Sequence, residues 1–136
     1  MGSGMLKIRN FSCSYIEEGE IVPKIELFFL EDDRFEVYGS GKQFDSKELV
    51  KLCEELKTIN SSLIFKENEN VRGCDGYSLD TYISDGYQSV EIDVWAPEED
   101  FLEGDKKTET LRWYRIIKAM VKVLNKNGID FKPWNM

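Results

Sequence analysis

The chain contains no histidine. Histidine is the commonest general base and metal ligand in proteins, so its absence removes every Ser-His and Cys-His catalytic couple. Only three cysteines are present, Cys13, Cys53 and Cys74, and no two of them are close in sequence. That pattern fits neither a disulfide framework nor a zinc site, and we expect reduced thiols. The sequence therefore disfavours an enzyme, and we expect no cofactor and no metal.

Long hydrophobic stretches are also missing. No apolar run approaches the roughly 20 residues that a bilayer span needs, and there is no signal-peptide hydrophobic segment. We therefore expect a cytoplasmic protein that does not bind membranes. Residues 1–4, Met-Gly-Ser-Gly, have the composition of an expression-tag remnant. Residues 5–136 are expected to form a single globular domain, because a chain of this length can bury about two thirds of its unfolded surface in one core.

Positive charge is scarce over most of the chain. Eighteen Lys and Arg stand against 26 Asp and Glu, which gives a net charge of -8. Residues 111–136 hold six basic side chains against Asp130 alone, a net of +5, so residues 1–110 hold -13. An acidic protein is repelled by nucleic acid and associates faster with a cationic protein. The charge thus favours a basic protein partner and disfavours nucleic acid.

The remaining pattern predicts an α+β domain. Alternating apolar residues predict three strands over residues 6–16, 21–30 and 34–38, which form a meander. Asp45 as N-cap and Glu48 three residues later predict a helix start, followed by apolar residues at helical spacing up to Ile59. Residues 63–65 are a candidate short strand. A second helix is expected to begin between residues 105 and 108 and to end before Gly128.

Residues 77–94 predict a β-hairpin that turns at Asp85-Gly86. The whole order is then β-β-β-α-(β)-β-β-α, an antiparallel sheet of about five strands with two helices packed on one face. The other sheet face is expected to be open to solvent.

The hairpin has two faces of opposite character. A two-residue turn pairs Ile83 with Gln88, Thr81 with Val90, Leu79 with Ile92 and Tyr77 with Val94, which assembles one mostly apolar face. The other face places Asp80 opposite Glu91. Like charges opposed across a strand pair are destabilising, and exposed rings among acids are typical of a binding patch for a basic partner. The predicted partner-binding residues are Asp80, Tyr82, Tyr87, Glu91, Asp93 and Trp95.

Other interpretations of these residues remain open. The acids could simply be solvated, or Asp80, Glu91 and Asp93 could hold Mg²⁺ or Ca²⁺ or act as acid/base carboxylates. Cys74 before Asp75-Gly76 could be a nucleophile at a tight turn, although only Arg72 is near to activate it. The basic side chains of the last helix could bind nucleic acid, but a solvated helix face that offsets nearby acids explains them as well.

The second half of the chain resembles a known class of protein. Its features are Asp75-Gly76, the hairpin with Ile83-Ser-Asp-Gly86, a strand ending in Val94-Trp-Ala-Pro97, and a helix beginning Leu111-Arg-Trp-Tyr114. Over residues 75–124 this order is similar to immunity proteins of bacterial polymorphic or contact-dependent toxin systems. The resemblance implies a small, acidic, cytoplasmic inhibitor that binds one cognate toxin domain. These families share no single fold or site, so the resemblance assigns no residue a role.

Two functions follow as expectations. The first is a non-catalytic immunity or inhibitor protein, expected to be a monomer, that neutralises a basic toxin through the acidic, aromatic hairpin face. The alternative is a bacterial adaptor or self-associating domain, possible as a homodimer, that uses the wide apolar face of the second helix, with Trp113 and Met120.

Overall fold

The computed structural model describes residues 4–12, 24–69, 77–95, 97–133 and 136. These residues form six strands and four helices. In chain order the elements are β1 (Met5–Ser12), β2 (Lys24–Phe29), β3 (Arg34–Val37), β4 (Gln43–Asp45), α1 (Lys47–Lys57), α2 (Ser61–Glu67), β5 (Tyr77–Ser84), β6 (Ser89–Trp95), α3 (Glu99–Gly104) and α4 (Thr108–Lys126).

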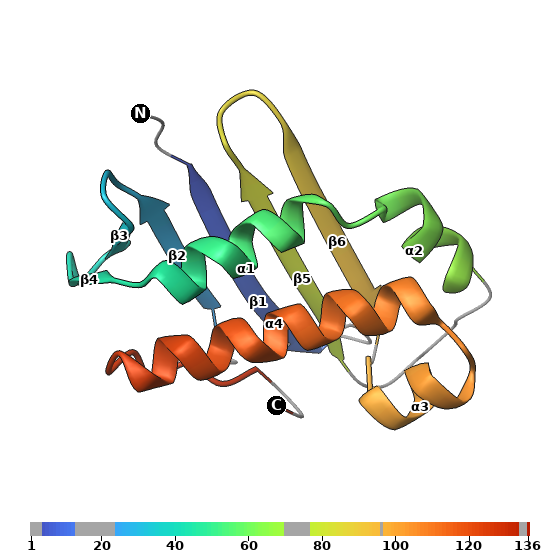
Figure 1. Cartoon of the computed structure of the whole chain (residues 1–136). Coiled ribbons are helices and arrows are strands. Elements are labelled where there is room, and N and C mark those ends of the chain that lie inside the picture. Colours follow the sequence, from blue (N-terminus) through green and yellow to red (C-terminus); the bar gives the residue numbers. More distant parts are fainter. Residues whose placement is uncertain (1–3, 13–23, 70–76, 96, 134–135) are drawn as a thin grey trace.

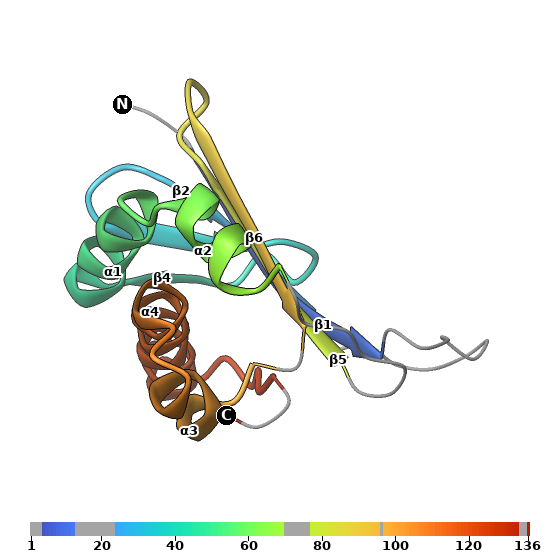
Figure 2. The same cartoon turned by 90° about the vertical axis from the view of Figure 1, so that its right-hand side faces the viewer.

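The strands form one antiparallel sheet in the order β4-β3-β2-β1-β5-β6 (Figure 1). β1 lies between β2 and β5, so the first strand of the chain joins the meander to the hairpin. All four helices lie on the same side of the sheet, and no described element covers the opposite face (Figure 2). The expected α+β class and antiparallel sheet are confirmed. The described residues contain six strands and four helices, where about five and two were expected.

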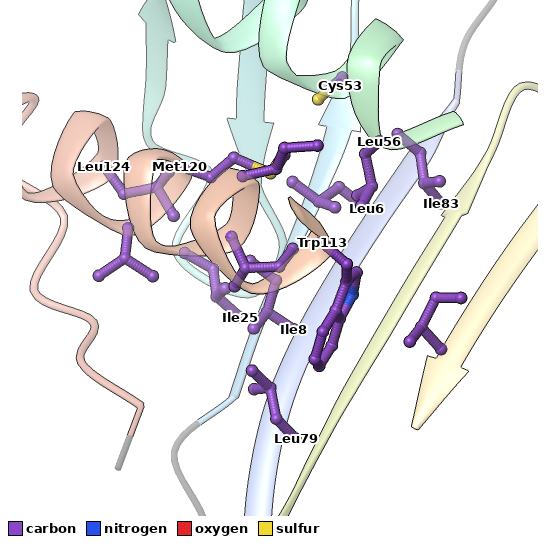
Figure 3. Packing of buried hydrophobic residues seen from close by; sticks show 14 of the residues in the cluster. Leu6, Ile8, Ile25, Cys53, Leu56, Leu79, Ile83, Trp113, Met120 and Leu124 are labelled. Atoms are coloured by element: carbon purple, nitrogen blue, oxygen red, sulfur yellow. The ribbon is translucent and has the colours of Figure 1, made fainter. Parts of the chain in front are cut away.

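The core lies between the sheet and helices α1 and α4. Alternate side chains of each strand point into it, among them Leu6 and Ile8 of β1 and Leu79 and Ile83 of β5. Figure 3 shows these residues packed around α4. The apolar face of α4 supplies the facing layer, with its most deeply buried residues being Trp113, Ile117, Met120 and Leu124. The self-association alternative requires the wide apolar face of α4 to be exposed. That face is buried in the protein's own core.

Two of the predicted helix details are wrong. The N-cap of α1 is Ser46, whose hydroxyl accepts a hydrogen bond from the Leu49 amide at 3.0 Å, one residue later than the expected Asp45. Residues 63–65 belong to helix α2 and not to a strand. Asn60 caps α2 because its side-chain oxygen accepts from the Leu63 amide at 3.0 Å, and Ile64 is buried. Apolar residues in so short a run do not distinguish a helix from a strand, whereas the cap does.

Two short elements were not expected. The first is α3, whose Leu102 is buried while Phe101 stays exposed. β4 adds a three-residue strand beside β3, and its Phe44 stacks on Phe35 with ring centroids 5.5 Å apart. Both elements are too short to leave a periodic signal in the sequence.

The hairpin register differs from the expected one by two residues. Thr81 pairs with Ile92 and Asp80 pairs with Asp93, so the expected opposition of Asp80 and Glu91 is wrong. The loop contains four residues, 85–88, because the Asp85 carboxylate accepts hydrogen bonds from the amides of Tyr87 and Gln88, both at 2.9 Å. A shift of two leaves every side chain on its expected face.

Candidate partner-binding face

The uncovered sheet face carries rows of side chains that run across the strands. One row runs from β2 to β6 and contains Glu26, Lys7, Tyr82 and Glu91 in register. The Lys7 ammonium lies 3.7 Å from Glu26 Oε1 and 6.0 Å from the centre of the Tyr82 ring. Lys24 adds a second contact to Glu26 at 3.5 Å. Glu26 is thus balanced locally by two lysines.

Glu91 ends that row at the edge of the sheet. Its side chain is exposed, and none of the described cations lies within ion-pair distance of it. Asp93 lies two residues further along β6 on the same face and is also exposed. The outer edge of the uncovered face thus carries two exposed carboxylates.

Asp80 does not belong to the accessible part of this face. It is only 6% exposed, and its register neighbours are Arg9 on β1 and Asp93 on β6. A side chain buried to this degree offers an external partner little surface to contact. We therefore do not count Asp80 among the partner-binding residues, because it is buried between β1 and β6.

The three predicted aromatic residues are all at least partly accessible. Tyr82 and Trp95 are half-buried on the uncovered face, with Tyr82 opposite Glu91 and Trp95 opposite Ser78. Tyr87 lies in the hairpin loop and is 97% exposed. None of the three is sealed in the core. The exposed carboxylates and these rings, Tyr82, Tyr87, Glu91, Asp93 and Trp95, are called the acidic edge surface below.

The hairpin loop that presents Tyr87 is held by its own backbone. The amides of Gln88 and Tyr87 donate to the Asp85 carboxylate and, together with the nearby Lys57 ammonium at 3.9 Å, hold the pKa of Asp85 below its usual value. Gly86 adopts a φ of 92°, which a residue with a Cβ rarely adopts. The loop sequence thus fixes the position of Tyr87 at the end of the hairpin.

A groove of about 520 Å³ follows β6. It is lined on one side by α2 and on the other by β6 and Asp80, and its residues are Ser61, Ile64, Phe65, Asn68, Asp80, Glu91, Ile92, Asp93, Val94 and Trp95. Phe65 is 75% exposed within it. The α2 side of this groove was not predicted, because residues 63–65 were a candidate strand. Asn60-Ser61-Ser62 was the available signal, since an Asn before two serines is a typical helix start.

Two basic side chains of α4, Arg115 and Lys118, are paired with acids of α3. Arg115 lies 3.8 Å from Glu99 and 3.7 Å from Glu103 of α3, and Lys118 lies 3.4 Å from Glu99. These contacts are exposed and individually weak. They place the cations of α4 beside the acids of α3, on the side of the sheet away from the acidic edge surface.

The described residues offer little for the chemical alternatives. No group of three or more His, Cys, Asp or Glu among them could hold a metal ion, and this covers Asp80, Glu91 and Asp93. Burial raises the pKa of the Cys53 thiol to about 12, which leaves it protonated. Cys13 and Cys74 lie outside the described residues. Among the described helices, none is long and apolar enough to cross a membrane.

Comparison with known proteins gives no relative. No protein-family model, no curated protein and no solved structure matches the chain.

Proposed function

We propose that this chain is a non-catalytic immunity or inhibitor protein that binds a basic bacterial toxin domain through the acidic edge surface. The observation that supports it is the exposure of Glu91 and Asp93 on a sheet face that no described helix covers, beside the half-buried Tyr82 and Trp95, with the exposed Tyr87 in the adjoining hairpin loop. The solvent-facing side of an antiparallel sheet is usually polar. Here the exposed acids and the rings are concentrated at one edge.

The two kinds of side chain have different roles in binding. The carboxylates of Glu91 and Asp93 attract a cationic surface at long range and raise the association rate. Tyr87 and Trp95 supply rigid contact area that is desolvated in the complex, and such rings commonly contribute about 2 kcal/mol or more at the centre of an interface. Charge would therefore govern the encounter, and the rings would govern the lifetime of the complex.

The test uses a candidate toxin domain, to be sought in the gene adjacent to this one. E91Q/D93N removes both exposed charges with little change of shape, and we expect it to weaken binding about tenfold, more at ~0.05 M salt than at ~0.5 M. The matched control is E48Q/D130N, which removes one Glu and one Asp charge from exposed sites elsewhere. Titration calorimetry measures the affinities, and co-expression measures protection of growth. Equal affinity of E91Q/D93N and the wild type would exclude the proposed surface.

The aromatic half of the surface has its own test. Y87A changes a side chain that is 97% exposed, so we expect the variant to fold normally. We expect it to increase the dissociation rate, and to change the association rate much less than E91Q/D93N does. Surface-plasmon kinetics separate the two rates.

A further inference from the structure

β6 is the outermost strand of the sheet on the hairpin side, and it is seven residues long. The amide of Asp85 donates to the carbonyl of Gln88 at 3.1 Å, which starts the alternation of hydrogen-bonded pairs along the hairpin. By that alternation the pairs Ile83–Val90 and Thr81–Ile92 exchange backbone hydrogen bonds. The backbone groups of residues 89, 91, 93 and 95 then point away from β5, toward the outer edge.

The groove of about 520 Å³ lies along this edge. Ile92 and Val94 of its lining point to the helical side of β6, whereas Glu91 and Asp93 point to the uncovered side. A hollow lined from both faces of one strand must follow the strand's edge. On the helical side it is bordered by Phe65 of α2, and on the other side by the two acids.

From this arrangement we propose that β6 accepts an added strand from the basic partner. The inference rests on the proposed function and names the form of the partner's binding segment. That segment is extended and alternates Lys or Arg with apolar residues, because successive side chains of a strand point to opposite faces. Its basic side chains would lie beside Glu91 and Asp93, and its apolar side chains would contact Phe65 on the helical side.

The charge of the edge argues against a second copy of this chain as the occupant. Two β6 strands joined edge to edge would bring Glu91 and Asp93 of both copies onto one face, and like charges on neighbouring strands are destabilising. Charged side chains on an edge strand are a known protection against such pairing. A cationic strand turns the same charges into attraction. The acids thus select the occupant as well as attract it.

The first experiment measures the backbone directly. The probe is a peptide of about ten residues that alternates Lys and Val, and the control is the same peptide with alternate backbone amides N-methylated. NMR-detected hydrogen exchange is followed at residues 89, 91 and 92 of the full chain. We expect the unmodified peptide to slow exchange at 89 and 91 at least about tenfold, with 92 already protected by β5. Equal protection by the methylated peptide, or none, would overturn strand addition.

A pair of variants separates backbone pairing from charge. E91P and E91Q remove the same charge, but E91P also removes an N–H that points to the outer edge, and an edge strand tolerates proline there. We expect E91P to bind the peptide and the toxin domain about tenfold more weakly than E91Q. S89P against S89A repeats the comparison at an uncharged residue if E91P fails to fold. Equal affinities within both pairs would contradict the inference.

The results distinguish this inference from the proposed function. If E91Q/D93N weakens toxin binding while E91P and E91Q remain equal, the acidic edge surface is the binding site and strand addition is wrong. If the peptide protects residues 89 and 91 while E91Q/D93N binds the toxin domain normally, strand addition holds and the charge-dependent function is wrong. Protection of these amides in the absence of peptide that grows with protein concentration would identify a second copy as the occupant and overturn the proposal.

Discussion

At the scale of single residues, one polar contact inside the core has a clear energetic role. Trp113 Nε1 donates to Thr81 Oγ1 at 2.8 Å, and both residues are buried. We predict that T81V destabilises the protein by about 1–3 kcal/mol, because valine keeps the shape but leaves the indole N–H without an acceptor. T81S keeps the hydroxyl and should cost about 1 kcal/mol or less. Urea unfolding followed by tryptophan fluorescence measures both, and a neutral T81V would contradict this role.

The thiol of Cys53 gives a second prediction at this scale. Its pKa is raised to about 12 by burial, and the thiolate is the reactive form. In a C13S/C74S background, we expect no stoichiometric reaction of Cys53 with a disulfide reagent at pH 8 in the native state. Complete reaction should follow addition of denaturant, which serves as the control for reagent access. Rapid labelling of the native protein would show that α1 opens readily over the sheet.

At the scale of elements, α2 and α4 stabilise each other's ends. Glu67 of α2 accepts hydrogen bonds from the amides of Glu109 and Thr110 at 3.1 and 2.8 Å, so it caps α4. In return Glu109 accepts from the Asn60 amide at the start of α2, at 2.8 Å. We predict that E67A costs about 1–2 kcal/mol of unfolding free energy. E67Q keeps an acceptor and should cost less; if both variants cost the same, the cap acts through charge alone.

This contact also has a pH dependence. The hydrogen bond from Arg112, with that from the Asn60 amide, holds the pKa of Glu109 below its ordinary value of 4.5. A carboxyl whose pKa is lower in the folded state stabilises it above the unfolded pKa, and this stability is lost as the pH falls through the folded pKa. We expect the difference in unfolding free energy between the wild type and E109Q to be constant above about pH 5.5 and to shrink below about pH 4.5. A difference that stays constant down to about pH 3 would contradict the assignment.

The hairpin illustrates what the sequence could predict at this scale and what it could not. The two faces follow from alternation alone, so Leu79 and Val94 are inside and Glu91 is outside, as expected. The register depends on whether Asp85-Gly86 forms a two-residue turn or begins a four-residue loop, and that choice is made by the Asp85 side chain. The burial of Asp80 depends on β1, a strand from the other end of the chain, and local patterns carry no information about it.

α2 could have been found from its cap, but its position could not. Asn60 is visible in the sequence as a helix start, whereas the contacts of Glu67 and Asn68 with the start of α4 join residues more than 40 positions apart. The groove along β6 depends on that placement, because α2 supplies Phe65. The sequence therefore indicated all five side chains of the acidic edge surface but not the helix α2 that borders the groove beside them.

At the scale of the whole molecule, the acidic side chains at the β6 edge bear on association. Arg115 and Lys118 of α4 are paired with acids of α3 in the helical layer, while Glu91 and Asp93 lie at the exposed edge of the sheet. If these acids prevent pairing of β6 with a second β6, removing them should permit it. We predict that E91Q/D93N forms a concentration-dependent dimer at neutral pH, whereas the wild type stays monomeric.

Light scattering coupled to size exclusion measures the masses, and E48Q/D130N controls for the loss of two charges that lie away from the edge. If E91Q/D93N forms a dimer and the other two proteins do not, the edge of β6 can pair with another strand. The charge of Glu91 and Asp93 then determines which strand it accepts. Adding a third substitution, S89P, tests whether the dimer forms through the backbone of β6. S89P removes an N–H that points to the outer edge without changing charge, so it should return the dimer to a monomer. A wild-type dimer, or a dimer of E48Q/D130N, would mean that net charge or another surface governs association, and β6 would lose its assigned role.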